Sequence, residues 1–460
     1  MLSRYIGDRA FYRRVLQVAV PIIIQVGITN FVSLLDNIMV GQVGTLPMSG
    51  VSIVNQILYV FNLCIFGATS GAGIFTAQFH GNNDHEGIRY TFRFKLVICT
   101  LLSLLAGAVI FLFRDRLIGL YLTGKGAAED AAQTLNYGRE YLSVMLWGLL
   151  PFGIANAYSG TLKESEETFV PMVAGVAAVF VNLVFNYILI FGHFGAPAMG
   201  VRGAALATVI SRYAELLLVA AWCHRNSQKH PFIQGAYATL KIPGKLCKSI
   251  IVTGMPLLIN EALWSSGIAI TNQCYSTCGL DVVPAINITS TLINLSSVVY
   301  LSLGSSVGIL MGRMLGAGLP AEEVRDTDRK LIAFSVSMGV LFGGLVAVGS
   351  NLFPHIYNTT EAVRSLAQDL ILISALFMPF HAFANATYFT LRSGGKTFIT
   401  FLFDSGFMWV CSIPLAFCLS RFTSLPILPL YAICQMPDVL KCALGYFMLK
   451  KGSWIQNLAS

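Results

Sequence analysis

Four polar side chains in otherwise apolar segments could bind a cation or carry a proton: Asp36, Asn182, Asn186 and Thr208. Asn182 and Asn186 are four residues apart and share one face of a helix. A sodium ion could be coordinated at Asp36, Asn182 and Asn186, and burial could equally let Asp36 hold a proton. The alternative is that the amides and the hydroxyl only bond helices together, and we favour it for Thr208 alone. Asp36 is the strongest functional candidate, because an ionisable group in apolar surroundings is costly to retain.

A second set of candidates lies in the C-terminal half of the chain. Glu261 and His381 fall near the middle of two apolar segments, with Trp264 one helical turn after Glu261. An acid next to an aromatic ring suits a lipophilic cation, so we assign Glu261, Trp264, His381, Asn385 and Asp404 to a substrate cavity. Glu261 and His381 could instead satisfy each other. For Asp404, near the end of its segment, a cavity role and an interfacial role weigh equally.

Two other ionisable side chains in this half can be assigned from their spacing. Asp438 and Lys441 are three residues apart in one apolar segment. Residues at this spacing are neighbours on a helix surface. We therefore predict that they neutralise each other and are structural.

The elements that carry these residues are predicted from the composition. Of 460 residues, 55% are hydrophobic and 11% charged, against about a quarter charged in soluble domains. A run of about 20 apolar residues can cross a bilayer of about 30 Å as a helix. We predict an all-α membrane protein with twelve spans, at roughly 15–40, 51–79, 94–113, 137–160, 170–192, 202–223, 250–275, 282–312, 331–352, 365–391, 398–420 and 426–449. Asp36, Asn186 and Thr208 then lie at similar depth, each five or six residues from a span end.

The chain is duplicated. Pro21 recurs as Pro256 and Gly44 as Gly279, 235 residues apart. Six spans per copy give both copies one orientation, so we predict parallel repeats about a central cavity: an N-terminal lobe at 1–223, a cytoplasmic linker at 224–249 and a C-terminal lobe at 250–460. The ionisable residues are not duplicated, since Asp36 aligns with Thr271.

Charge and motifs limit the function. The net charge of +8 comes from basic residues that gather on one side of the predicted spans. This is typical of cytoplasmic loops, so we expect both termini in the cytoplasm and no nucleic-acid partner. No P-loop, nucleophile elbow or paired-histidine motif occurs, so we expect no enzyme and no ATP-driven step. We also interpret the ten cysteines as small core residues, with no metal site at Cys274 and Cys278.

Several segments resemble the multidrug and toxic compound extrusion (MATE) family over essentially the whole chain. These are Leu34-Leu35-Asp36-Asn37-Ile38-Met39-Val40-Gly41 after Pro21, Asn182 and Asn186 before Phe191-Gly192, the Gly203–Thr208 run, Gly254-Met255-Pro256 with Glu261, and the Leu391–Thr397 run. The resemblance implies a proton- or sodium-coupled exporter of organic cations, in which Asp36 is the coupling acid beside the Asn pair. Some members add an Asp in the tenth span, at 365–391, where this chain has Phe380 to Asn385. Archaeal members have an Asp at the position of Asn186.

We therefore predict a multidrug efflux antiporter that needs no cofactor beyond the coupling ion, H+ or Na+. Its partners would be small organic cations and membrane lipid, and it would act as a monomer in the cell membrane. The alternative is a flippase for lipids or lipid-linked oligosaccharides of related architecture. Such a flippase should have a cavity rich in Arg or Lys to receive phosphate. Here Arg212 and Lys441 each have an acid three residues away.

Overall fold

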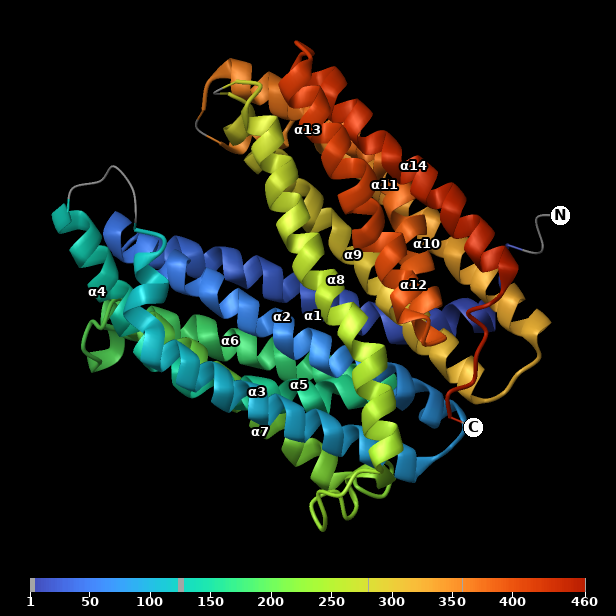
Figure 1. Ribbon diagram of the computed structural model, residues 1–460. Coiled ribbons are helices and arrows are strands. Elements are labelled where there is room, and N and C mark those ends of the chain that lie inside the picture. Colours follow the sequence, from blue (N-terminus) through green and yellow to red (C-terminus); the bar gives the residue numbers. More distant parts are fainter. Residues whose placement is uncertain (1–4, 123–127, 280, 358, 460) are drawn as a thin grey trace. The chain divides into compact units, whose positions relative to one another are not determined.

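The computed structural model describes residues 5–122, 128–279, 281–357 and 359–459, and none of them is in a strand. The main helices are α1 (Arg9–Gly41), α2 (Thr45–Gly81), α3 (His85–Gly119), α4 (Ala128–Met145), α5 (Leu149–Glu164), α6 (Phe169–Phe191), α7 (Val201–Arg225), α8 (Gly244–Ser276), α9 (Val282–Gly316), α10 (Ala321–Gly349), α11 (Glu361–Ser393), α12 (Thr397–Phe401), α13 (Ile413–Phe422) and α14 (Ile427–Lys451) (Figure 1). Among the described residues twelve helical segments are long and apolar enough to cross a membrane, one at each predicted span. The predicted all-helical class with twelve spans is confirmed.

Two of the twelve spans are not single α-helices. One comprises α4 and α5, joined by a 3-10 turn at Leu146–Gly148. The other runs through α12, two π-helical turns at Leu402–Gly406 and Met408–Ser412, and α13. Apolar periodicity cannot reveal such turns, which often occur at functional sites.

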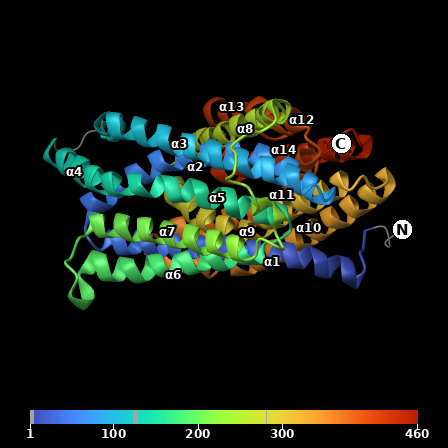
Figure 2. The ribbon, with the colours of Figure 1, turned by 90° about the horizontal axis from the view of Figure 1, so that it is seen from below.

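The helices group into two compact units. The N-terminal unit comprises Ile24–Thr76 and Asp84–Gly254, and the C-terminal unit comprises Met1–Ile23, Ala77–Asn83 and Met255–Ser460. In the N-terminal unit α6 packs along α7, and α5 contacts both α3 and α7 (Figure 2). In the C-terminal unit α11 packs against α9, α10 and α14 (Figure 1). The predicted lobes at 1–223 and 250–460 are the two copies of the sequence duplication. They are defined differently from the two units and stay a prediction.

The duplication recurs in the backbone. α1 ends at Gly41 and α8 at Ser276, again 235 residues apart. The turn after each helix contains a glycine with positive φ, 142° at Gly44 and 152° at Gly279. Side chains are rarely tolerated in that conformation, so both turns need glycine.

Proline marks the change of unit in both copies. α1 contains Pro21 and passes from one unit to the other after Ile23, whereas α8 passes between them just before Pro256. Proline removes a backbone hydrogen bond and is a common cause of helix bending. Both helices therefore have a weakened point at the boundary of the units.

The predicted linker is folded onto the N-terminal unit. α7 ends at Arg225 and α8 begins at Gly244. Between them, the guanidinium of Arg93 donates to the carbonyls of Gly235 (2.7 Å), Ala236 (2.8 Å) and Lys241 (3.2 Å). Arg89 also donates to the Pro231 carbonyl, at 3.2 Å. Polar composition predicts a connector here, but it does not show that arginines of α3 fasten it.

Candidate functional site

Asp36, Asn182, Asn186 and Thr208 lie together in the N-terminal unit, on α1, α6 and α7. The Asn186 amide donates to Asp36 Oδ1 at 2.6 Å and to Asn182 Oδ1 at 3.2 Å. Asn182 Nδ2 in turn donates to Thr208 Oγ1 at 3.3 Å. The predicted convergence of these side chains is therefore present in the structure. Their role in coupling stays a prediction.

The Asn182 amide has two acceptable orientations. With its oxygen and nitrogen exchanged, the nitrogen donates to both Asp36 oxygens, at 3.0 and 2.9 Å, and the oxygen accepts from Thr208 Oγ1 at 3.3 Å. The orientation of a side-chain amide is assigned from the hydrogen bonds that it makes. An ionised carboxylate only accepts, so it requires the exchanged orientation, whereas a protonated Asp36 can donate to the Asn182 oxygen. The amide can thus match either protonation state.

The oxygen atoms of this group suit a hard cation. Asn186 is 2% exposed, and its Oδ1 is buried without a hydrogen-bond partner. Carboxylate, amide and hydroxyl oxygens such as those of Asp36, Asn186 and Thr208 are the ligands that alkali and alkaline-earth ions prefer. Among the described residues no cluster of three His, Cys, Asp or Glu could hold a metal ion. The donor set fits sodium, and the Asp36 carboxyl fits a proton equally well.

One residue near this group was not predicted. Tyr141, on α4, is 5% exposed, and its hydroxyl lies 3.4 Å from Asn55 Oδ1. Its electrostatic neighbours include Asp36 and Arg212. A buried hydroxyl in a span is the signal that could have identified it, since buried Tyr normally has a partner.

In the C-terminal unit Asp404 is the centre of a polar cluster. Lys441 Nζ donates to its Oδ1 at 2.6 Å, and Asn260 Nδ2 donates to its Oδ2 at 3.0 Å. The Lys441 ammonium also lies 5.2 Å from the centre of the Phe403 ring. The hydrogen-bonded partner of Lys441 is thus Asp404 on the π-helical segment, and Asp438, which was predicted to neutralise Lys441, remains one of its electrostatic neighbours.

His381 pairs with Asp438, not with Glu261. Its Nε2 lies 3.0 Å from Asp438 Oδ2, across α11 and α14. The suggestion that Glu261 and His381 satisfy each other is therefore wrong. Glu261 makes no hydrogen bond to another described side chain, and its electrostatic neighbours are Arg392 and Asp404.

Two of the predicted cavity residues remain, Trp264 and Asn385. Trp264 is 43% exposed. Asn385 has a buried Oδ1 without a partner and packs against Gly304 of α9, where glycine permits the close approach. Their role in a substrate cavity stays a prediction.

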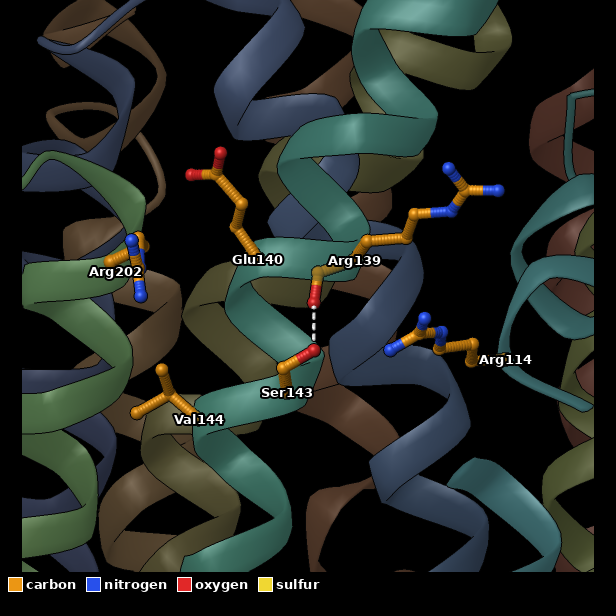
Figure 3. Close-up of a pocket in the computed structure, with 6 residues that line it drawn as sticks. All are labelled: Arg114, Arg139, Glu140, Ser143, Val144 and Arg202. Atoms are coloured by element: carbon orange, nitrogen blue, oxygen red, sulfur yellow. Dashed lines mark hydrogen bonds between the residues drawn. The ribbon is translucent and has the colours of Figure 1, made fainter. Parts of the chain in front are cut away.

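A hollow of about 280 Å³ lies elsewhere in the N-terminal unit, lined by Arg114, Arg139, Glu140, Ser143, Val144 and Arg202 (Figure 3). Arg139 Nε lies 2.6 Å from Asp115 Oδ1, and Arg114 Nε lies 3.7 Å from the same atom. Its basic lining does not suit a cation, and none of the predicted site residues contributes to it.

Comparison with known proteins identifies the family. The MatE family model matches the chain twice, at residues 21–188 and 256–418, and the two matches begin 235 residues apart. The chain belongs to the multidrug and toxic compound extrusion (MATE) family. It is thus a multi-pass membrane protein of a transporter family, as predicted. The double match also agrees with the duplication.

Curated relatives match along nearly the whole MATE chain. It is 25% identical to the probable multidrug resistance protein NorM of Thermotoga maritima, over 91% of this chain and 88% of that protein. It is also 25% identical to the multidrug resistance protein PmpM of Pseudomonas aeruginosa, over 91% and 86%.

Solved structures confirm the fold. A MOP superfamily transporter from Pyrococcus furiosus has a TM-score of 0.83 at 17% identity, covering 98% of both chains. The Vibrio cholerae MATE transporter VcmN in its bent form has a TM-score of 0.84 at 16% identity, covering 96% of this chain and 97% of that one.

Proposed function

We propose that this MATE transporter is a secondary active multidrug exporter, which exchanges organic cations for protons or sodium ions. Family membership and the names of its relatives support multidrug export. The observation that carries the ion coupling is the Asp36 group, in which a carboxylate on α1 is bonded to Asn186 on α6.

The coupling step follows from the hydrogen bonds of Asp36. A proton that binds from outside removes the negative charge of the carboxylate, and a sodium ion balances that charge and competes for its oxygens. The Asn182 amide and the Asn186 donor then lose their charged acceptor, which changes how α1 is held against α6. α1 contains Pro21, where a missing backbone hydrogen bond lets the helix bend. An ion that binds two conformations with different affinity shifts the population between them, and so favours outward release of the substrate.

The substrate class follows from the sign of the membrane-embedded charges. Glu261, Asp404 and Asp438 are carboxylates on helices of the C-terminal unit, and Phe403 and Trp409 lie in the same region of the chain as Asp404. Acids with aromatic neighbours favour lipophilic cations over anions. The transporter needs no cofactor, acts as a monomer within membrane lipid, and takes no nucleic acid.

The flippase alternative is less well supported. Its phosphate-bearing substrate needs a basic cavity, and the basic hollow of the N-terminal unit has two of its three arginines beside Asp115. Lys441, within the membrane-spanning part, is paired with Asp404. Neither arrangement leaves a strongly positive cavity.

The test is export of a cationic dye from proteoliposomes under separately imposed proton and sodium gradients. We expect export to follow at least one gradient in the wild type and to lose that dependence in Asp36→Asn. Asp130→Asn, which removes an exposed acid on α4 of the same unit, is the matched control. Export that follows neither gradient, or a full ion dependence in Asp36→Asn, would overturn the proposal.

The orientation in the membrane is proposed from the basic residues. Their distribution supports a protein that spans the cell membrane with both termini in the cytoplasm. A fluorescent protein fused after Ser460 should be visible inside intact cells, and a cell-impermeant label on an N-terminal tag should fail to react until the cells are opened.

A further inference from the structure

Asp404 has one fixed partner and one movable partner. The fixed partner is Asn260, on α8, which is 1% exposed. Its Oδ1 accepts from the Ser405 backbone at 3.2 Å, and its own carbonyl accepts from Ser405 Oγ at 2.8 Å. Together with the hydrogen bond that Asn260 Nδ2 donates to Asp404 Oδ2, these contacts fasten Asn260 to the turn that carries Asp404, and they orient the Asp404 carboxylate.

The movable partner is Lys441. Its ammonium is carried on a flexible four-carbon stem, and it holds Asp404 by a single bond of 2.6 Å. The two side chains remain 13% and 18% exposed, so the pair is not sealed in the core. The Lys441 side chain can therefore leave Asp404 while the turn that carries Asp404 stays folded.

A second carboxylate is within reach of Lys441. Asp438 is three residues earlier on α14 and is among its electrostatic neighbours. The bond from His381 uses Asp438 Oδ2, and a carboxylate can accept several hydrogen bonds at once. Lys441 thus has an acceptor to move to, on its own helix.

The local charges have room for one more cation. Three carboxylates, Glu261, Asp404 and Asp438, interact with two permanent cations, Lys441 and Arg392. The other neighbours are His381 on Asp438, together with the Tyr275 and Tyr300 hydroxyls near Asp438 and the Tyr388 hydroxyl near Asp404. By formal charge these carboxylates outnumber the two permanent cations by one. A monovalent organic cation would balance this excess.

We propose that Asp404 is a binding site for organic cations whose resident occupant is Lys441, and that the substrate binds by displacing the Lys441 ammonium from Asp404 to Asp438. The inference rests on the proposed export of organic cations and assigns the residue that competes with them. After release of the substrate, Lys441 returns to Asp404, so that this carboxylate is never left unpaired in the membrane. Lys441 then weakens substrate binding and promotes release.

The experiment measures binding of tetraphenylphosphonium to the full chain in lipid nanodiscs. Lys441→Met removes the competitor and should tighten binding by about tenfold. In Lys441→Arg the guanidinium can form a bidentate pair with the Asp404 carboxylate, so the affinity for tetraphenylphosphonium should fall by about fivefold. The double variant Lys441→Met with Asp404→Asn should lose the gain. Lys450→Met, at an exposed position of α14, should bind as the wild type does.

Triphenylphosphine oxide, which has similar rings and no charge, should bind to all of these variants alike. Equal affinity for tetraphenylphosphonium in the wild type, Lys441→Met and Lys441→Arg would overturn the inference. If Lys441→Met does not fold, Lys441→Arg against the wild type decides it, since unchanged affinity contradicts displacement. The two proposals can fail separately. If the affinities follow the predicted order of the Lys441 variants but export is not coupled to an ion, only the proposed coupling is contradicted. If export is coupled but the affinities do not follow that order, only the role of Lys441 is contradicted.

Discussion

The Asn182 side chain faces the Asp36 carboxyl with an atom 3.0 Å from Oδ1 and 2.9 Å from Oδ2. An ionised Asp36 requires that atom to be the amide nitrogen, and a protonated Asp36 can donate to the amide oxygen. Thr208 follows the change, because its hydroxyl can donate to Asn182 or to the Ala204 carbonyl, 3.0 Å away. The proton on Asp36 therefore sets the direction of a hydrogen-bond chain from α1 to α7.

Asn182→Leu should change the pH dependence of export while it keeps the shape of the site. Leucine has a similar volume but cannot donate to ionised Asp36, so the protonated form is favoured and the pH profile of dye export should move to higher pH. Thr208→Val, which keeps the shape and removes the hydroxyl, should move the profile in the same direction by less. The measurement is export from proteoliposomes between pH 5.5 and 8.5. An unmoved profile in Asn182→Leu would show that this amide does not contribute to ion coupling.

The positions of single polar residues could be predicted from the sequence much better than their partners. Asp36 with Asn186 was predictable, because both lie a similar number of residues from a span end and depth follows from helical rise. His381 with Asp438 and Lys441 with Asp404 were not, since the azimuth of each helix is set by packing between α11, α14 and the π-helical turns. An i to i+3 spacing permits a pair, but a carboxylate on a neighbouring helix can take the lysine instead.

The folded connector should loosen in mild acid. His230 lies against Trp222 and Phe232, and burial lowers the pKa of its imidazole from the ordinary value of 6.5. The undocked connector therefore binds the proton more readily, so docking is most stable above about pH 6.5 and is weakened as pH falls below it. Hydrogen exchange over residues 226–243, corrected for its intrinsic pH dependence, should rise between pH 7.5 and 5.5.

His230→Phe keeps an aromatic ring and has no charge to gain, so exchange in the connector should no longer depend on pH. His85→Phe, at an exposed position in the same unit, is the matched control and should behave as the wild type does. An acid response that survives in His230→Phe would assign the loosening to other groups.

Gly71 allows α2 to contact the N-terminal part of α8. A methyl group at Gly71 would lie 2.6 Å from Gly254 Cα and 2.9 Å from the Ile250 carbonyl oxygen, and neither backbone atom can move aside cheaply. Gly71→Ala should therefore lower the free energy of unfolding by about 1–3 kcal/mol, the usual cost of overpacking. Gly254→Ala should cost less, because its methyl would approach only to 3.4 Å of Gly71 Cα.

Thermal unfolding of the purified protein in one detergent checks this order. Gly27→Ala is the control, since nothing lies within 4 Å of the position its methyl would take. A melting temperature for Gly71→Ala equal to that of Gly27→Ala would show that the two helices do not pack this closely.

Lys95 is a fully buried cation that the N-terminal unit neutralises internally. It forms a salt bridge with Glu164 and donates to Thr76 Oγ1 and Thr161 Oγ1, each at 3.2 Å, which joins α3 to α5 and α2. Lys95→Met would leave Glu164 without its cation and should destabilise the protein by about 3–5 kcal/mol. Glu164→Gln alone would leave the lysine in the core with two hydroxyls and should cost a similar amount.

Removing both charges should cost much less than the sum of the two single changes, because a buried pair can often be replaced by uncharged side chains at little cost. The measurement is a double-mutant cycle on thermal or denaturant unfolding. The control cycle uses Lys330→Met and Asp326→Asn, which remove a more exposed salt bridge. That pair, one turn apart on α10, should show a coupling below about 1 kcal/mol. Additive losses at Lys95 and Glu164 would mean that the two charges are stabilised separately. A large coupling would establish the pair as the contact that holds α3 to α5 in the N-terminal unit.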